Sequence, residues 1–204
     1  MIDCRLVPAL VQLLPAEEEE QIQTTILDTL HNTLKVNPMP ALDAGAIGVF
    51  TELLGHNSQQ IVWRAARNIM GITVPLGGKN AACAEGVLEP LIKLLTASHT
   101  PEVINNACAA LMSIAITTEG KLKMVEAGVV KLLPPLLDHE DERVLLNAIK
   151  LITTVSEAPR ARAALLESAV ARLEELKGFR GDRLDVMAVS RSATTAVDTI
   201  TWTP

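Results

Sequence analysis

The sequence predicts an all-α protein built as a solenoid, in which small groups of helices repeat along the chain. The first observation is a leucine-rich segment that recurs at intervals of 40, 41, 42 and 40 residues. Its copies end at Leu14, Leu54, Leu95 and Leu137, and a weaker copy ends at Lys177. A constant period of this length is typical of helical repeats that stack on their neighbours.

The second observation is a longer segment that recurs with nearly the same period as the first. Its apolar residues form one stripe. Its copies begin at Ile22, Ile61, Val103 and Val144, at intervals of 39, 42 and 41 residues. Apolar residues recur four and eight positions later, and this spacing places them on one face of a helix. In three copies the middle residue is alanine, which lets a neighbouring helix approach closely. We therefore expect long amphipathic helices that pack side by side.

A third, shorter helix is expected before the later copies of the leucine-rich segment. It covers residues 79–85, 121–127 and 162–168. Glycine follows at Gly86 and Gly128, and Gly45 holds the matching place in an earlier copy, where it permits a left-handed turn between two helices. Three helices with such a corner are typical of the armadillo repeat rather than of the two-helix HEAT repeat. The predicted fold is an armadillo-like, right-handed superhelical solenoid of three-helix repeats.

The whole chain, residues 1–204, is predicted to form a single array. It divides into a partial repeat over 1–36, full repeats over 37–76, 77–118 and 119–158, and a C-terminal cap repeat over 159–204. Thr100, Pro101 and Glu102 illustrate the signals for a long helix: an N-cap, a first-turn proline and an acid. The apolar stretch after Arg5 resembles the start of a secretory signal, but it aligns with three later copies, which favours a repeat.

Composition excludes several classes of partner. The chain is 49% hydrophobic, has a net charge of −6 and contains only two Phe, two Trp and no Tyr. A nucleic-acid binder needs a basic footprint and often aromatic rings for stacking, so we expect no nucleic-acid partner. The same lack of a basic stretch argues against a membrane surface, and no apolar run is long enough to span a bilayer. Three widely spaced cysteines indicate a reducing compartment.

The sequence predicts a non-catalytic protein with no cofactor and no metal. Residues 77–80, Gly-Gly-Lys-Asn, resemble a phosphate loop, but the pattern lacks the earlier glycine and the Ser or Thr after the lysine, so a turn between helices is favoured. His56, His99 and His139 follow three successive leucine pairs, yet rungs ~8–10 Å apart cannot bring three ligands to one zinc ion. We expect them to be exposed loop histidines. No Ser-His-Asp order and no G-x-S-x-G motif stands out.

A binding surface is expected on the long helices, which line the concave face of armadillo arrays. Because each residue advances ~100° around a helix, the third, sixth and tenth positions after the start of the apolar stripe share a different face. The candidate protein-binding residues on this face are Arg64, Arg67, Asn106, Asn147 and Lys150. They predict a polar, mildly basic groove that contacts an acidic helix or an extended acidic chain. The alternative is a solvated helix face without a partner.

Peptide-binding armadillo proteins of the nuclear-import type carry asparagine and tryptophan ladders in this groove. At the asparagine positions this chain has Asn32, Gly71, Ser113 and Thr154, and at the tryptophan positions Asp28, Arg67, Ala109 and Lys150. Since Asn32 alone fits the pattern, recognition of basic peptides of that type is not expected.

Several stretches, taken together, resemble the radial spoke head protein 14 family. They are residues 17–30, 77–95, 101–121, 144–166 and 200–204. The resemblance spans nearly the whole chain, and the ordered set is more persuasive than any one motif. It implies a structural armadillo component of the radial spoke in the axoneme of motile cilia or flagella, where it would join other spoke subunits in a large complex. The family has no catalytic residues to transfer.

Members of that family are longer, with further repeats ahead of the point where this chain begins. Met1 therefore falls within a repeat, and the expectation is either a shortened version or an apolar end that a neighbouring subunit covers. The expected location is the cytoplasm and cytoskeleton, within the axoneme of a cilium or flagellum. The alternative function is a soluble cytosolic armadillo adaptor that binds peptide or helical partners.

Overall fold

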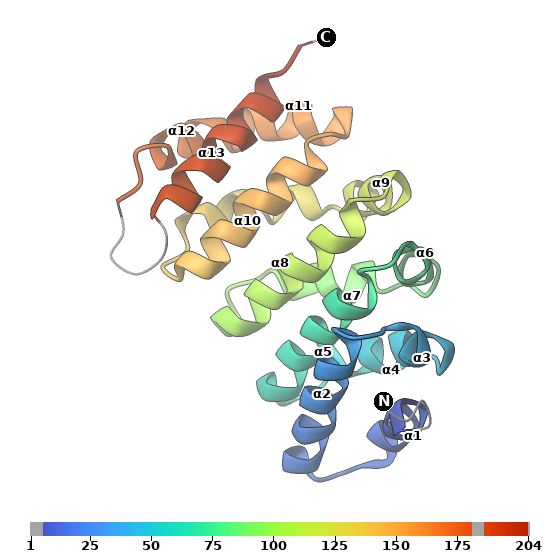
Figure 1. Cartoon of the computed structure of the whole chain (residues 1–204). Coiled ribbons are helices and arrows are strands. Elements are labelled where there is room, and N and C mark those ends of the chain that lie inside the picture. Colours follow the sequence, from blue (N-terminus) through green and yellow to red (C-terminus); the bar gives the residue numbers. More distant parts are fainter. Residues whose placement is uncertain (1–5, 181–185, 204) are drawn as a thin grey trace.

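Five long helices lie side by side in chain order and form the rungs of the array (Figure 1). The structure is a computed structural model that describes residues 6–180 and 186–203. The rungs are α2 (Glu20–Leu34), α5 (Gln59–Ile72), α8 (Pro101–Ala115), α10 (Glu142–Val155) and α13 (Val186–Thr201). Each rung packs on the next, and all regular structure in the described ranges is helical. The predicted all-α solenoid is confirmed.

Shorter helices precede each rung and form the rest of the stack. They are α1 (Leu6–Leu13), η1 (Leu14–Ala16), α3 (Met39–Asp43), α4 (Ala46–Leu53), α6 (Leu76–Ala84), α7 (Leu88–Lys93), α9 (Thr118–Glu126), η2 (Val129–Lys131), η3 (Pro134–Asp138), α11 (Pro159–Ser168) and α12 (Val170–Leu176), where η marks a 3₁₀ helix. Residues 1–5, 181–185 and 204, which belong to the predicted partial and cap repeats, lie outside the described residues.

The predicted glycine corners are confirmed. Gly45, Gly86 and Gly128 have φ angles of +76°, +75° and +83°, and no other described residue has a positive φ. Each lies between the first and second helical element of its group. An L-residue in this left-handed conformation is strained by ~1–2 kcal/mol, so glycine lets the chain change direction there without that strain.

One predicted helix is wrong. The leucine-rich copy that ends at Leu137 was expected to be helical like the others, but it forms the two short 3₁₀ segments η2 and η3. Pro134 has no N–H to donate, and in an α-helix its ring would clash with the carbonyl of Val130. The tighter 3₁₀ turns avoid that clash and still bury Leu136 and Leu137.

The apolar stripes of the rungs make up the core. On α8, Val103, Ala107 and Leu111 are completely buried, as the four-residue spacing predicts. Ile22 is the exception, because it lies in the first turn of α2 and remains 41% exposed. Within the described residues α2 is the first rung, so a single long helix, α5, packs along it.

Helix starts depend on side chains that accept backbone N–H groups. The hydroxyl of Ser58 accepts from the backbone N of Gln60 at 3.2 Å, and the carboxylate of Asp141 accepts from that of Arg143 at 2.9 Å. The Thr100 side chain, which was expected to do the same for α8, makes no such bond. Among the described residues, no helix combines the length and the apolar character that a membrane span requires.

Candidate protein-binding groove

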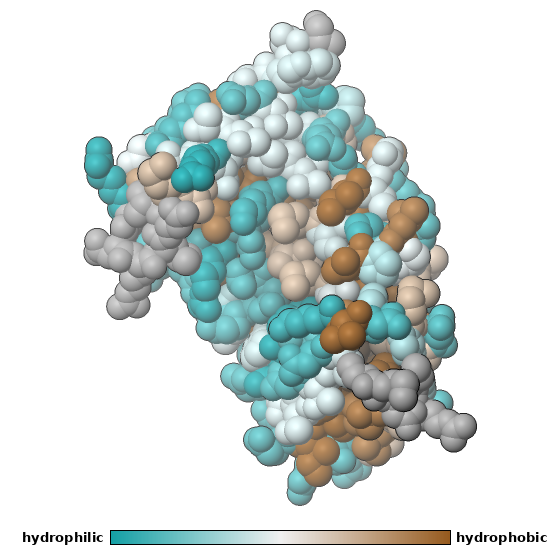
Figure 2. Space-filling model, viewed as in Figure 1, coloured by the Kyte–Doolittle hydropathy of each residue, from teal (hydrophilic) through white to brown (hydrophobic). Residues whose placement is uncertain are grey.

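The five predicted groove residues lie on three consecutive rungs. Arg64 and Arg67 are on α5, Asn106 is on α8, and Asn147 and Lys150 are on α10. The two arginines meet in one cluster with a side chain from α2, whereas the other three residues make separate contacts or none. Figure 2, in the orientation of Figure 1, shows hydrophilic side chains gathered over α5 and the first part of α8.

Asp28 of α2 joins the two arginines through a single oxygen. Its Oδ1 accepts from Arg64 Nε at 3.0 Å and from Arg67 Nη2 at 2.5 Å. Arg64 is fixed further by Nη1, which donates to the backbone O and the Oε1 of Gln60 at 3.0 and 2.9 Å. Burial of Asp28 opposes its ionisation, but the hydrogen bonds from Arg67 and Arg64 outweigh that effect and hold the pKa of this carboxyl below its usual range.

Trp63 supports both guanidinium groups. The Cζ atoms of Arg64 and Arg67 lie 4.1 and 4.8 Å from the centroid of its ring. The indole Nε1 donates to Oε1 of Gln60 at 3.2 Å, which keeps the ring in place. Cations over an indole face are attracted by its quadrupole, so Trp63 holds the arginines in position. The arginine cluster is therefore Asp28, Gln60, Trp63, Arg64 and Arg67.

His31 lies on α2, one turn after Asp28, and adds no charge to the cluster. Burial, followed by the charges of Arg67 and Lys35, lowers the pKa of His31 to about 4. Its Nδ1 atom is buried and has no hydrogen-bond partner among the described residues. At neutral pH the imidazole is therefore uncharged, and the two arginines face one carboxylate.

The other three predicted residues behave differently from the arginines. Asn106 donates to the backbone O of Glu102 on its own helix at 2.8 Å. Asn147 donates to Oδ1 of Asn105 at 2.8 Å and so links α10 to α8. Lys150 is exposed, and no described residue pairs with it. Only Asn147 thus links two rungs, and the positive charge of the five predicted residues comes from Arg64, Arg67 and Lys150.

The sequence projection missed Trp63 and the role of Asp28. Asp28 falls on the projected groove face but was not expected to pair with the arginines, and Trp63 falls at a position that the groove pattern does not include. A signal was present, since Trp63 is one of just two tryptophans and adjoins an arginine. The pairing across 36 and 39 residues could not be derived from spacing on one helix.

The loop histidines are half-buried rather than exposed, which corrects the expectation. The Nδ1 atoms of His56 and His139 each accept a backbone N–H, from Ser58 and Asp141, at 3.0 Å. They help to begin α5 and α10, so their rings are held against the chain. The described residues contain no group of three or more His, Cys, Asp or Glu side chains that could hold a metal ion.

The buried thiols are poor nucleophiles. Cys108 is fully buried, as expected for a small core residue, and burial raises its pKa to about 12. Burial, followed by the charge of Glu119, also raises the pKa of Cys83. Because the thiolate is the reactive form, neither group suits covalent catalysis. Cys4 lies outside the described residues.

Comparison with known proteins places this geometry in a fold family. Residues 77–115 and 117–153 match the family model described as the armadillo/beta-catenin-like repeat. The designed armadillo repeat protein YIII(Dq)4CqI aligns over 95% of this chain and 82% of its own, with a TM-score of 0.83 and 27% identity. The chain is an armadillo-repeat solenoid.

Two further relatives of this armadillo chain are informative. A designed armadillo repeat protein in complex with the peptide (KR)4 is 26% identical, with a TM-score of 0.82, over 94% of this chain and 81% of that one. Vacuolar protein 8 of Candida albicans is 28% identical over 133 residues, which are 64% of this chain and 23% of that protein. The match thus spans under a quarter of this natural relative.

Proposed function

We propose that this armadillo array is a non-catalytic scaffold that binds an acidic segment of a partner protein over α5 and its neighbouring rungs. The arginine cluster carries the proposal. Arg64 and Arg67 share one oxygen of Asp28, so Nη2 of Arg64 and Nη1 of Arg67 keep N–H groups that no described residue accepts. A carboxylate from a partner can take these donors without displacing Asp28, and charge-assisted bonds of this kind are strong.

The charge of the groove decides the chemistry of the partner. The designed relative described above holds a peptide of alternating Lys and Arg, whereas this groove carries Arg64, Arg67 and Lys150 against the single carboxylate of Asp28. Electrostatic complementarity then favours a partner rich in Asp or Glu. The side chains of Arg64 and Arg67 are only 17% and 20% exposed and pack against Trp63, which fixes them before binding and reduces the entropy lost on association.

A defined peptide tests the groove. We would measure the affinity of a fluorescent Glu-rich octapeptide for the full chain and for the double variant Arg64→Glu with Arg67→Glu. The expected result is a loss of at least about tenfold in affinity. The control is Lys93→Glu with Lys131→Glu, which changes the net charge equally at exposed sites on α7 and η2. Equal losses in the two variants would leave only a non-specific charge effect and refute the groove.

At the level of the assembly, we propose that the scaffold is a subunit of the axonemal radial spoke, where it joins other spoke proteins. The support is the ordered resemblance over residues 17–30, 77–95, 101–121, 144–166 and 200–204. The second candidate is a cytosolic adaptor for transient acidic partners, which the free N–H groups of the arginine cluster favour equally.

Extraction of axonemes separates these two candidates. A spoke subunit stays with the axoneme after detergent treatment and is released by salt together with known spoke proteins. A cytosolic adaptor is released by detergent alone. Immunoblotting of both fractions decides between them, and recovery of the chain entirely in the detergent extract would exclude the spoke role.

A further inference from the structure

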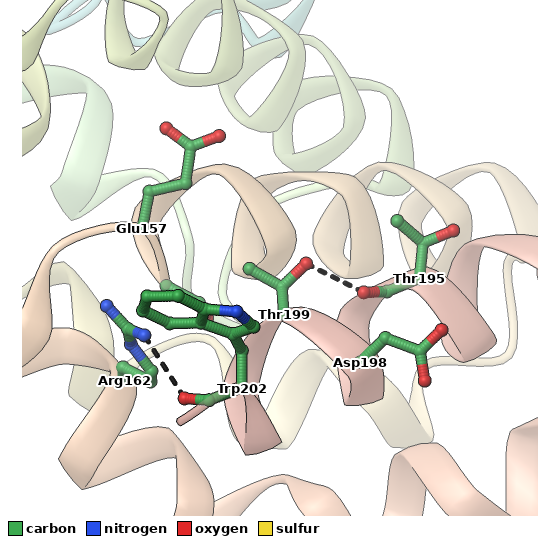
Figure 3. Close-up of a pocket in the computed structure, with 7 residues that line it drawn as sticks. Glu157, Arg162, Thr195, Asp198, Thr199 and Trp202 are labelled. Carbon is green, nitrogen blue, oxygen red and sulfur yellow. Dashed lines mark hydrogen bonds between the residues drawn. The ribbon is translucent and has the colours of Figure 1, made fainter. Parts of the chain in front are cut away.

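A second surface feature lies at the opposite end of the array, away from the arginine cluster. A cavity of about 460 Å³ opens between the end of α10, the start of α11 and the last turns of α13 (Figure 3). Its labelled lining residues are Glu157, Arg162, Thr195, Asp198, Thr199 and Trp202. None of them belongs to the predicted groove, and the volume falls within the range of about 300–1,000 Å³ typical of ligand pockets.

Trp202 is exposed yet held in one place. This residue follows Thr201, the last residue of α13, and is 57% exposed. Arg162 of α11 donates from Nη1 to the backbone O of Trp202 at 3.3 Å, and its Cζ lies 5.0 Å from the centroid of the ring. Figure 3 shows Arg162 on one side of the indole, with Thr199 and Asp198 on the other. A fixed, open aromatic ring is a common anchor at protein interfaces.

The hydroxyl groups that line the cavity already donate their hydrogens to backbone carbonyl groups of their own helices. Thr195 donates to the backbone O of Arg191 at 3.1 Å, and Thr199 donates to that of Thr195 at 2.8 Å. Ser156 donates to the backbone O of Ile152 at 2.7 Å. A hydroxyl that donates in this way presents only its lone pairs to a ligand. These hydroxyl groups therefore offer only acceptors, and a ligand that bonds to them must bring the donors.

The charge of the lining points the same way. Asp198 is exposed on α13 and has no ion-pair or hydrogen-bond partner among the described residues. Glu157 pairs with Lys121 of α9, but its side chain is still 60% exposed and can accept further bonds. Two carboxylates thus line the cavity with one guanidinium, that of Arg162. An incoming group that complements this wall is a cation with several N–H donors.

We propose that this pocket binds an arginine side chain of a partner protein, with its guanidinium stacked on Trp202 and hydrogen-bonded to Asp198. Arginine fits better than lysine because its planar guanidinium stacks on aromatic faces and matches a carboxylate with two parallel bonds. Arg162 already packs against the same ring, which demonstrates that the indole accepts such a contact. The inference does not depend on the arginine cluster of α5, because it uses other rungs and the opposite charge.

Tryptophan fluorescence gives a direct test. The chain has two tryptophans, so Trp63→Phe leaves Trp202 as the reporter. We would titrate this variant with N-acetyl-arginine amide, with the lysine analogue and with the citrulline analogue, which has the shape of arginine without its charge. The expected result is saturable quenching by the arginine compound, with a dissociation constant on the order of 1 mM, and at least about fivefold weaker binding of the other two compounds.

A substitution separates site binding from general attraction. In the Trp63→Phe background, Asp198→Asn is expected to weaken arginine binding at least about fivefold. Asp43→Asn, which removes an exposed carboxylate from α3 at the other end, is expected to leave binding unchanged. Circular dichroism checks that each variant is folded. Quenching that does not saturate, equal quenching by citrulline or lysine, or equal effects of the two substitutions would overturn the proposal.

Discussion

At the scale of single residues, the Asp28 carboxylate sets what the arginine cluster can bind. It neutralises one of two guanidinium charges and uses one N–H group of each arginine. A basic peptide would meet two like charges here, and this repulsion costs several kcal/mol when the groups are partly desolvated. The remaining donors therefore select for an anionic side chain, and Asp28 keeps the arginines aligned until one arrives.

His31, next to this cluster, predicts a pH dependence of stability. Burial and the nearby charges of Arg67 and Lys35 hold its pKa at about 4, below the ordinary value of 6.5. As the pH falls from 6.5 towards 4, the unfolded chain takes up a proton that the folded chain refuses, so stability falls in that window. Above pH 6.5 both states are neutral at this site and the effect vanishes.

Substitution of His31 by glutamine should therefore reduce the loss of stability on acidification. We expect the fall in melting temperature between about pH 7 and about pH 5, followed by circular dichroism, to be smaller in His31→Gln than in the wild type. Asn32→Gln, an exposed substitution on the same helix, is the control and should retain the wild-type fall. An unchanged pH profile in His31→Gln would show that this histidine titrates alike in both states.

At the scale of elements, close approach of helices depends on two glycines that the sequence could not distinguish from turn residues. A Cβ on Gly78 would lie 1.9 Å from the backbone O of Ile72, and one on Gly120 would lie 2.5 Å from that of Ile114. These glycines let α6 and α9 pass under the ends of α5 and α8. Residues 77–80, which were expected to form a turn between helices, lie instead within α6, where Gly78 serves helix packing and Lys79 donates to the backbone O of Val74 at 2.5 Å.

The adjacent pair Gly77 and Gly78 provides a matched test. Gly78→Ala is expected to lower the free energy of unfolding by about 1–3 kcal/mol, because backbone atoms must move to admit the methyl group. Gly77→Ala meets nothing nearer than 3.7 Å and should raise it by about 0.5–1 kcal/mol through better helix propensity. Urea unfolding measures both. Equal effects of the two substitutions would contradict the packing explanation.

The success of the sequence prediction differed between elements for physical reasons. Long helices have a strong 3.6-residue period, so the stripe through Val103, Ala107 and Leu111 was recognisable. The glycine corners were recognisable because few other residues tolerate a positive φ. The proline effect at Pro134 was missed because the leucine pattern of the segment remains intact. Cross-helix contacts, such as that of Asp28 with Arg64, depend on how rungs are rotated, which a period does not specify.

At the scale of the whole molecule, the array has two ends of different character. The arginine cluster lies on the first two described rungs, and the acceptor-lined pocket of Trp202 lies on the last. A partner segment with acidic residues at one end and an arginine at the other would contact both sites in only one orientation along the array. Leu6 and Leu13 of α1 are each 47% exposed and Ile22 of α2 is 41% exposed, so this end of the array also presents apolar surface.

The stack also predicts how stability is distributed. Each rung packs mainly on its neighbours, so interior rungs are held from both sides and terminal rungs from one. Hydrogen exchange followed by mass spectrometry should therefore find the slowest amides in α8 and faster exchange in α2.

Gly78→Ala should accelerate exchange in α5 and α6 more than in α13, because the strain that the methyl group introduces weakens with each intervening rung. Uniform acceleration across all peptides would instead indicate that the array unfolds as one cooperative unit.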